Sequence, residues 1–192
     1  RRQIEGVDPA ALSEILAIVG PRRSGKTYYM YQLVAELLRT SAAQKEDILF
    51  VDFEDYRLSG LQPSGIDQLL VDFNRLAGRS PSFLFFDEIQ HLPEWSRVLR
   101  TLHNQSRYRI MVSGSNSSLL AQEVATELRG RYRDLVMLPF SFPEILSLKE
   151  ISYSRRTFHT PAKGLLLAAF DEYLTTGGFP EVIAKKTQTE RR

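Results

Sequence analysis

Short apolar runs alternate along the chain with longer segments in which apolar residues recur every three to four positions. The short runs are rich in β-branched and aromatic side chains, which is typical of strands that are buried on both faces. The longer segments have the spacing of amphipathic helices. The expected strands are residues 15–19, 48–53, 83–86, 109–115 and 135–138.

Helical periodicity separates these strands and continues after the last of them. The expected helices are residues 28–39, 66–77, 94–104, 118–128, 142–148 and 164–175. Alternating strands and helices predict an α/β fold, with a parallel sheet of about five strands and helices on both faces. Because the strands stop near Pro139, we expect residues 1–140 to form this core and residues 141–192 a small helical, lid-like segment.

The loop between the first strand and the first helix fits the phosphate-binding pattern G-x-x-x-x-G-K-[ST]. A strand, a glycine turn and a helix N-terminus together present backbone N–H groups and a positive dipole end to a polyphosphate. Lys26 is expected to reach the β- and γ-phosphates, and Thr27 to place its hydroxyl on Mg²⁺. Arg22 and Arg23 either contact phosphates or face solvent. The predicted nucleotide-binding residues are Gly20, Pro21, Arg22, Arg23, Ser24, Gly25, Lys26, Thr27 and Tyr28.

Two carboxylates, Asp87 and Glu88, directly follow the apolar run at residues 83–86. They stand at the carboxyl end of a strand, where open α/β sheets bind their ligands. We expect Asp87 to hold Mg²⁺ through water and Glu88 to polarise the attacking water. The alternative is that both residues cap the next helix or face solvent; the phosphate loop upstream argues against it.

Glu88 also separates classes of reaction. A kinase that acts on a small molecule needs no water-activating residue, since its acceptor is the substrate hydroxyl, so Asp followed by Glu favours hydrolysis. One intervening strand, residues 48–53, indicates that the loop strand and the Asp-Glu strand are not neighbours in the sheet. That arrangement is typical of ATPases with an additional strand and a catalytic Glu. Asp52, which ends the intervening strand, is a candidate to restrain Glu88.

Small polar residues end the fourth expected strand, and a basic segment follows the next helix. Ser113 or Ser115 could touch the γ-phosphate or the attacking water, or the segment could be a turn that caps a helix. Arg129 or Arg131 could reach a neighbouring subunit's γ-phosphate as an arginine finger. The alternative for these arginines is a solvated basic turn.

The composition excludes several classes of protein. The chain has no Cys and only three His, which excludes disulfides and makes a structural zinc site unexpected. A net charge of +2 gives no argument for binding to nucleic acid or membrane. Neither a membrane span nor a signal peptide is visible, so we expect a cytoplasmic protein. The first and last residues, Arg1 and Arg192, favour a fragment of a longer protein.

Several motifs occur in an order that resembles one known group. They are Gly-Pro-Arg-Arg-Ser-Gly-Lys-Thr, Phe-Leu-Phe-Phe-Asp-Glu-Ile-Gln, Val-Ser-Gly-Ser-Asn-Ser-Ser-Leu-Leu, Arg-Gly-Arg-Tyr, Leu-Pro-Phe-Ser-Phe-Pro-Glu-Ile and Gly-Gly-Phe-Pro-Glu-Val. Across residues 15–183 the chain resembles the prokaryotic AAA+-like ATPases, a family abundant in archaea that carries an extra C-terminal domain of uncertain function.

The resemblance implies a role for each matching residue. Lys26 and Thr27 correspond to Walker A and Asp87 and Glu88 to Walker B. The residue that corresponds to sensor 1 is Ser115 or Ser113, and Arg129 or Arg131 becomes a finger acting in trans within a homo-oligomer. Contacts with DNA or a protein partner would come from the C-terminal domain, which this sequence does not include.

The motifs together favour an ATPase with ATP and Mg²⁺ as cofactors, whose hydrolysis serves as a conformational switch or motor for an appended domain. A second hypothesis is a scaffold that holds nucleotide, hydrolyses it negligibly and acts in a DNA- or signalling-related assembly. A small-molecule kinase is the third, with Glu88 against it. The residues do not distinguish ATP from GTP.

Overall fold

The computed structural model describes residues 7–114, 128, 130–154 and 162–184. These residues divide into two compact units. The sheet unit comprises residues 7–20 and 26–137, and the helical unit comprises residues 21–25 and the chain from Leu138 onward.

The sheet unit is built on five parallel strands in the order β2-β3-β4-β1-β5. β4 lies between β1 and β3, so the strand before the phosphate loop and the strand before Asp87 are not neighbours. This order confirms the predicted α/β sheet of the additional-strand type. The strands are β1 (Ile15–Val19), β2 (Ile48–Asp52), β3 (Phe83–Asp87), β4 (Arg109–Gly114) and β5 (Tyr132–Val136).

The last strand begins earlier than the apolar run at residues 135–138 indicates. β5 starts at Tyr132, opposite Ile15 in the register with β1, and includes Arg133 and Asp134. These polar residues are tolerated because β5 lies at the edge of the sheet, where side chains remain largely exposed. An apolar pattern therefore locates central strands better than edge strands.

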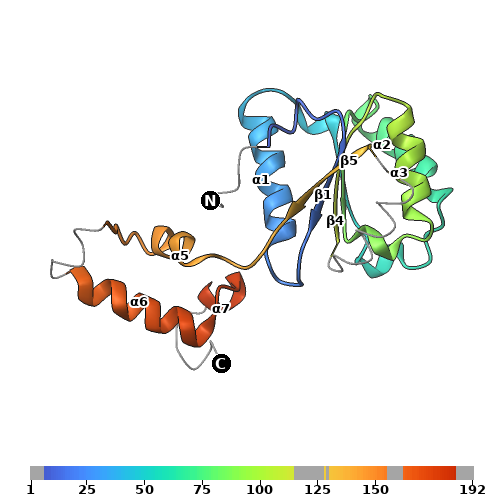
Figure 1. The fold of residues 1–192 in the computed structure, drawn as a ribbon. Helices are drawn as coiled ribbons and strands as arrows, with labels where there is room; N and C mark the ends of the chain where they lie inside the picture. Colours follow the sequence, from blue (N-terminus) through green and yellow to red (C-terminus); the bar gives the residue numbers. More distant parts are fainter. Residues whose placement is uncertain (1–6, 115–127, 129, 155–161, 185–192) are drawn as a thin grey trace. The chain divides into compact units, whose positions relative to one another are not determined.

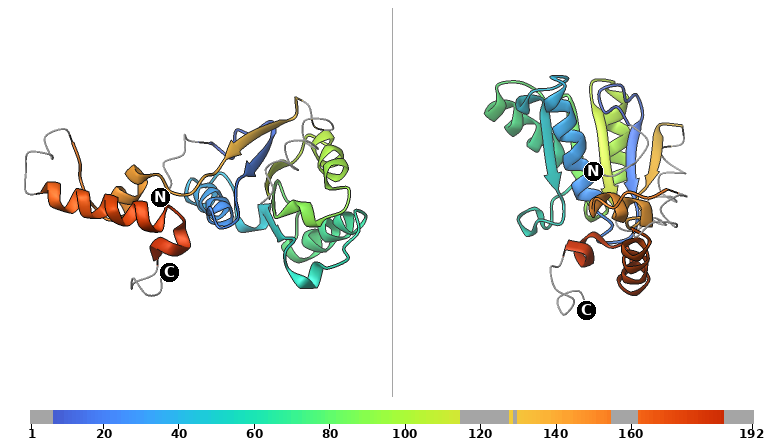
Figure 2. Two further views of the ribbon diagram at one scale, coloured as in Figure 1. Left: turned by 60° about the horizontal axis from the view of Figure 1, so that its bottom comes forward. Right: turned by 90° about the vertical axis from the view of Figure 1, so that its left-hand side faces the viewer.

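Helices cover both faces of the sheet, as predicted, with α1 on one face and α2 and α3 on the other (Figures 1 and 2). Successive β3 side chains point to opposite faces. Phe85 stacks on Phe50 at 6.0 Å between ring centroids, and Phe50 in turn contacts Tyr31 of α1 at 5.1 Å. Phe86 points the other way and meets the ring of Phe53 edge-on at 5.6 Å. The helices are α1 (Lys26–Arg39), α2 (Gly65–Ala77) and α3 (Trp95–Asn104), with short 3-10 turns η1 (Lys45–Asp47), η2 (Tyr56–Leu58) and η3 (Ile89–His91).

The helical unit contains three helices, α5 (Phe142–Leu148), α6 (Ala162–Thr176) and α7 (Pro180–Ala184). Leu146, Leu166 and Ala169 form its small core. Gly178 passes so close to the backbone that an added Cβ would lie 2.0 Å from the carbonyl oxygen of Phe140, so only glycine fits there. Two residues later Pro180 begins α7, at a helix position suited to proline.

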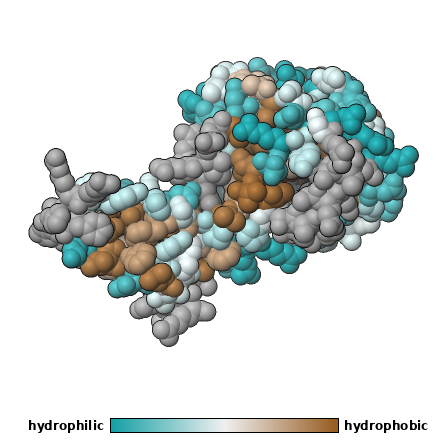
Figure 3. Space-filling model, in the orientation of Figure 1, coloured by the Kyte–Doolittle hydropathy of each residue, from teal (hydrophilic) through white to brown (hydrophobic). Residues whose placement is uncertain are grey.

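Apolar side chains are also exposed on the helical unit, as Figure 3 shows. Leu165 and Leu174 of α6 are 65% and 67% exposed. No helix among the described residues is both long enough and apolar enough to cross a bilayer. The predicted helix at residues 118–128 lies outside the described residues except for Leu128.

Two leucine truncations measure how much the central strands stabilise the fold. Leu84→Ala in β3 is expected to lower the free energy of unfolding by about 3–5 kcal/mol, because Leu84 is fully buried and its removal leaves a cavity. Leu76→Ala in α2 is the matched control, with an expected change below about 0.5 kcal/mol, since Leu76 is 88% exposed. Urea unfolding followed by circular dichroism measures both. Equal losses would contradict the assignment of β3 to the centre of the core.

Candidate active site

Three segments of the sheet unit carry polar residues to the same edge of the sheet. β1 leads into the phosphate loop, β3 ends at Asp87, and β4 carries Ser113 near its end. Because all the strands are parallel, their carboxyl ends meet at one edge, which is where open α/β sheets bind ligands. The first turn of α1 brings Lys26 and Thr27 to the same edge.

The phosphate loop has the backbone that its motif requires. Gly25 has φ +98°, a conformation that strongly favours glycine, and α1 begins at the next residue. Lys26 is only 4% exposed, and its Nζ donates a hydrogen bond to the carbonyl oxygen of Gly20 at 3.3 Å. The lysine ammonium thus lies beside the carbonyl of Gly20 at the N-terminus of α1, a position that suits a bound polyphosphate.

A buried hydroxyl joins the two acidic residues. Ser113 is fully buried; its Oγ donates a hydrogen bond to Asp87 Oδ1 and accepts one from the backbone N–H of Glu88 at 3.1 Å. The side chain of Thr27 also hydrogen-bonds to Asp87. The sequence favoured Ser115 for this position, with Ser113 as the alternative. The structure gives Ser113 this bridging contact, and Ser115 lies outside the described residues.

The contact between Thr27 and Asp87 bears on the predicted metal site. A hydroxyl from the phosphate loop and a carboxylate from β3 lie within hydrogen-bonding reach of each other. Mg²⁺ in nucleotide sites is bound by one or two protein oxygens together with phosphates and water. Thr27 and Asp87 therefore fit this ion. Among the described residues, no group of three or more His, Cys, Asp or Glu forms an all-protein metal site.

Burial raises the pKa of Asp87, and the charges of Glu88 and Asp52 raise it further. Hydrogen bonds from Ser113 and Thr27 act in the opposite direction. The net result is a carboxylate that is costly to keep ionised unless a cation neutralises it.

This shift predicts a gain in stability for Asp87→Asn measured without metal. Since the folded-state pKa is raised, the contribution of Asp87 to stability is full below its unfolded-state pKa and is lost as pH rises through the folded-state pKa. Asparagine cannot ionise, so the protein does not lose this stability at higher pH. The amide oxygen can still accept a hydrogen bond from Ser113. We expect Asp87→Asn to melt at a higher temperature than the wild type at pH 7 in EDTA, and the difference to shrink towards pH 4. If Asp87→Asn melted at a lower temperature than the wild type at pH 7, the raised pKa of Asp87 would be contradicted.

Glu88 lies between two side chains that contact its carboxylate. Its Oε1 is 3.6 Å from Nζ of Lys26, and its Oε2 accepts a hydrogen bond from Nε2 of Gln90 at 2.6 Å. The backbone of Glu88 is left-handed, with φ +51° and ψ +48°. Such a conformation costs about 1–3 kcal/mol and occurs preferentially at functional sites. The sequence motif predicted Glu88 but did not single out Gln90, whose only signal was its place two residues later.

The remaining predicted residues are placed as follows. Arg22 is exposed, and Arg23 forms an ion pair with Glu181 at 3.2 Å within the helical unit. Tyr28, at the start of α1, is 77% exposed. Asp52 Oδ1 accepts a hydrogen bond from the backbone N–H of Glu54 at 2.9 Å.

Of the two arginine-finger candidates, the structure describes only Arg131. Arg129 lies outside the described residues. Arg131 is exposed and immediately precedes β5, so it lies at the amino-terminal edge of a parallel sheet whose phosphate loop is at the carboxyl-terminal edge. A role for Arg131 in phosphate binding would therefore have to be in another copy of the chain.

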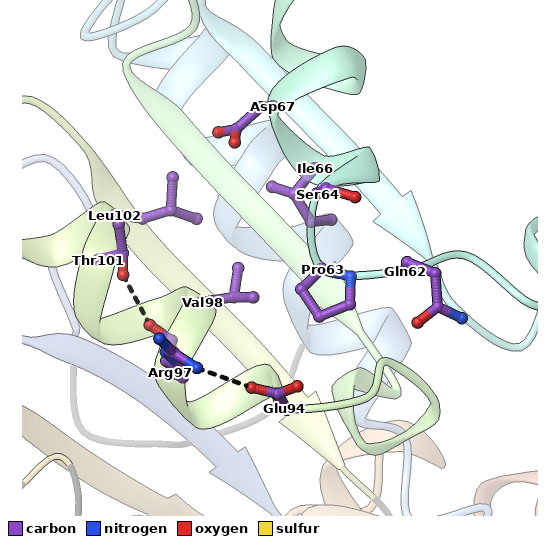
Figure 4. Close-up of a pocket in the computed structure, with 10 residues that line it drawn as sticks. All are labelled: Gln62, Pro63, Ser64, Ile66, Asp67, Glu94, Arg97, Val98, Thr101 and Leu102. Atoms are coloured by element: carbon purple, nitrogen blue, oxygen red, sulfur yellow. Dashed lines mark hydrogen bonds and ion pairs between the residues drawn. The ribbon is translucent and has the colours of Figure 1, made fainter.

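A separate pocket of about 470 Å³ lies between α2 and α3 (Figure 4). Val98 and Leu102 are part of its apolar lining, and Arg97 donates a hydrogen bond to Glu94 at 3.2 Å beside them. None of the predicted nucleotide-binding residues lines this pocket.

The sheet order, the phosphate loop after β1 and the acidic pair at the end of β3 together define a P-loop α/β fold of the additional-strand type. A family model described as "AAA domain" matches residues 12–146. The chain belongs to this AAA family.

Two relatives cover most of the chain. The chain is 36% identical over 170 residues to an uncharacterized protein of Methanocaldococcus jannaschii. The matched region covers 88% of this chain and 36% of that protein. It is 30% identical over 169 residues to an uncharacterized protein of Haemophilus influenzae, covering 88% of this chain and 40% of that one. The chain thus spans well under half the length of these relatives.

Two solved structures have a similar fold. Caenorhabditis elegans PCH-2 matches with a TM-score of 0.54 at 12% identity, over 95% of this chain and 57% of that one. Saccharomyces cerevisiae Hsp104, solved in a complex with casein, matches with a TM-score of 0.53 at 14% identity, over 90% of this chain and 33% of that one. At these identities the likeness concerns the fold alone.

Proposed function

We propose that this chain binds ATP and hydrolyses it in a Mg²⁺-dependent reaction. The observation that carries the proposal is the arrangement around Glu88, whose carboxylate lies 3.6 Å from the phosphate-loop lysine Lys26. Thr27 and Asp87 contact each other at the same edge of the sheet. The groups that such a reaction needs therefore come from two separate motifs.

Each residue has a distinct task in this mechanism. The backbone N–H groups of the phosphate loop and Lys26 bind the phosphates and offset the charge that develops on them. Glu88 accepts a hydrogen bond from the attacking water and aligns it with the γ-phosphorus. Thr27 and Asp87 hold Mg²⁺, which when bound neutralises charge on the β- and γ-phosphates. Ser113 keeps Asp87 and the backbone of Glu88 in a fixed relation.

The position of Glu88 favours hydrolysis over the two rival functions. A kinase of small molecules would require the space beside the γ-phosphate for an acceptor hydroxyl, whereas here the carboxylate lies next to Lys26. A scaffold that holds nucleotide without turnover requires the phosphate loop but not an acidic residue in this place. The scaffold remains the second candidate function, favoured if binding is found without phosphate release.

The wider role rests on parts outside the described site. The relatives are more than twice as long as the matched region, which supports an ATPase that acts as a switch or motor for an appended domain. A homo-oligomer in which Arg129 or Arg131 acts in trans is consistent with the position of Arg131 away from its own phosphate loop. A partner, whether DNA or protein, would then be bound by the appended domain.

Isothermal titration with ATP, followed by an assay of phosphate release, tests the proposal. We expect ATP binding in the presence of Mg²⁺, and release of inorganic phosphate that stops when EDTA is added. Binding with no release at any protein concentration would replace the proposal by the scaffold. Transfer of the γ-phosphate to a small-molecule acceptor would replace it by the kinase.

A further inference from the structure

We propose that Gln90 is a positioning residue, whose side-chain amide fixes the direction of the Glu88 carboxylate. The inference rests on the proposed hydrolysis and adds to it a residue for which the sequence motifs predicted no role. It is carried by the hydrogen bond from Gln90 Nε2 to Glu88 Oε2, which measures 2.6 Å. Hydrogen bonds to a charged acceptor are shorter and about twice as strong as neutral ones.

The turn that carries Gln90 is held firmly in the core. Gln90 is the central residue of η3, whose flanking residues Ile89 and Leu92 are 0% and 1% exposed. Backbone hydrogen bonds from His91 to Glu88 (3.1 Å) and from Leu92 to Ile89 (3.0 Å) close the turn. A side chain that projects from such a turn starts from a fixed point, which a positioning role requires.

The Glu88 carboxylate needs the hydrogen bond from Gln90, because the last side-chain torsion of a glutamate does not fix the orientation of its carboxylate. The last torsion of a glutamate side chain is broad, so the carboxylate turns easily unless its oxygens are bound. The side chain of Glu88 is only 15% exposed, which limits the number of waters that can bind it. Gln90 binds one oxygen, and the other is directed towards Lys26 at 3.6 Å.

Lys26 cannot fill this role alone, since the bound phosphates would compete for its ammonium group. The mechanism gives Gln90 no contact with the phosphates. Its amide is neutral, so it orients the carboxylate without adding a second positive charge that would reduce its ability to accept a proton from water. Gln90 thus leaves Glu88 Oε1 directed towards Lys26, where it would accept a hydrogen bond from the attacking water.

Two substitutions distinguish the effect of the amide hydrogen-bond donor from the effect of side-chain size. Gln90→Glu keeps the shape but replaces the donor by a carboxylate, and Gln90→Leu removes the donor with little change in size. Both are expected to lower kcat about 10- to 100-fold, as for a catalytic group displaced by about 1 Å. The Kd for the slowly hydrolysed analogue ATPγS with Mg²⁺, measured by calorimetry, should stay within about twofold, because Lys26 and the loop are unchanged. His91→Ala, in the exposed next position of η3, is the control and should match the wild type.

The outcomes separate the inference from the proposed function. A wild type that binds ATPγS but releases no phosphate from ATP overturns the proposed hydrolysis, and this inference with it. An active wild type with unchanged kcat in Gln90→Leu and Gln90→Glu overturns the inference alone. So does an equal loss of kcat and affinity together with a lower melting temperature, which would indicate a structural role. In the Glu88→Gln background, Gln90→Leu should have no further effect on the residual single-turnover rate; an additive loss would again contradict positioning through Glu88.

Discussion

Glu88→Gln is expected to reduce steady-state ATP turnover by about 10²–10⁴-fold while the protein still binds ATP. The amide cannot accept a proton from water, whereas its size and its ability to contact Gln90 are nearly those of the carboxylate. Lys26 loses an ion-pair partner at 3.6 Å and becomes more available to the phosphates. The Kd for ATP should therefore be unchanged or a few-fold lower, as measured by calorimetry beside the phosphate-release assay.

The control for this substitution is Glu150→Gln. Glu150 is exposed and, like Glu88, has a left-handed backbone, with φ +57°. Glu150→Gln therefore makes the same chemical change at a residue with the same backbone conformation. ATP turnover in this variant should equal that of the wild type. If Glu88→Gln hydrolysed ATP at the wild-type rate, Glu88 would not be the residue that activates water.

Lys26→Ala is expected to weaken ATP binding by about 10- to 100-fold or more and to abolish turnover. A hydrogen bond to a charged group contributes about 1.5–3 kcal/mol, and a factor of ten in affinity corresponds to about 1.4 kcal/mol. The truncation also leaves the carboxylate of Glu88 without its cation, which adds repulsion towards the phosphates. The Kd is measured by titration with ATPγS and Mg²⁺.

Lys45→Ala provides the comparison for Lys26→Ala. Lys45 is exposed in η1, so its removal changes the net charge by the same amount without touching the site. We expect its Kd to equal that of the wild type. A Lys26→Ala protein with wild-type affinity, confirmed as folded by circular dichroism, would show that the phosphate loop is not where ATP binds.

Much of the fold could be predicted because its signals are local. The phosphate loop is a contiguous motif, and the apolar run before Asp87 marks a strand covered on both faces. The single strand between these motifs was enough to predict that β1 and β3 are separated, and β4 lies between them. The prediction placed β5 too late in the sequence, because an edge strand tolerates polar residues such as Arg133 and Asp134.

The contacts within the site could not be predicted because they join residues that are distant in the sequence. Ser113 meets Asp87 only because β4 pairs with β3, and sequence reasoning could not choose it over Ser115. The hydrogen bond between Gln90 and Glu88 depends on a left-handed glutamate followed by a 3-10 turn. Backbone conformations of this kind are rarely visible in the sequence when the residue is not glycine.

The most direct test of the proposed hydrolysis is phosphate release from ATP by the wild-type chain, measured at increasing protein concentration with Mg²⁺ and with EDTA. We predict release that depends on Mg²⁺ and whose rate per molecule rises with concentration, as expected for an arginine supplied by a neighbouring copy. A rate at background at every concentration, from protein that binds ATP, would contradict hydrolysis and identify a nucleotide-binding scaffold.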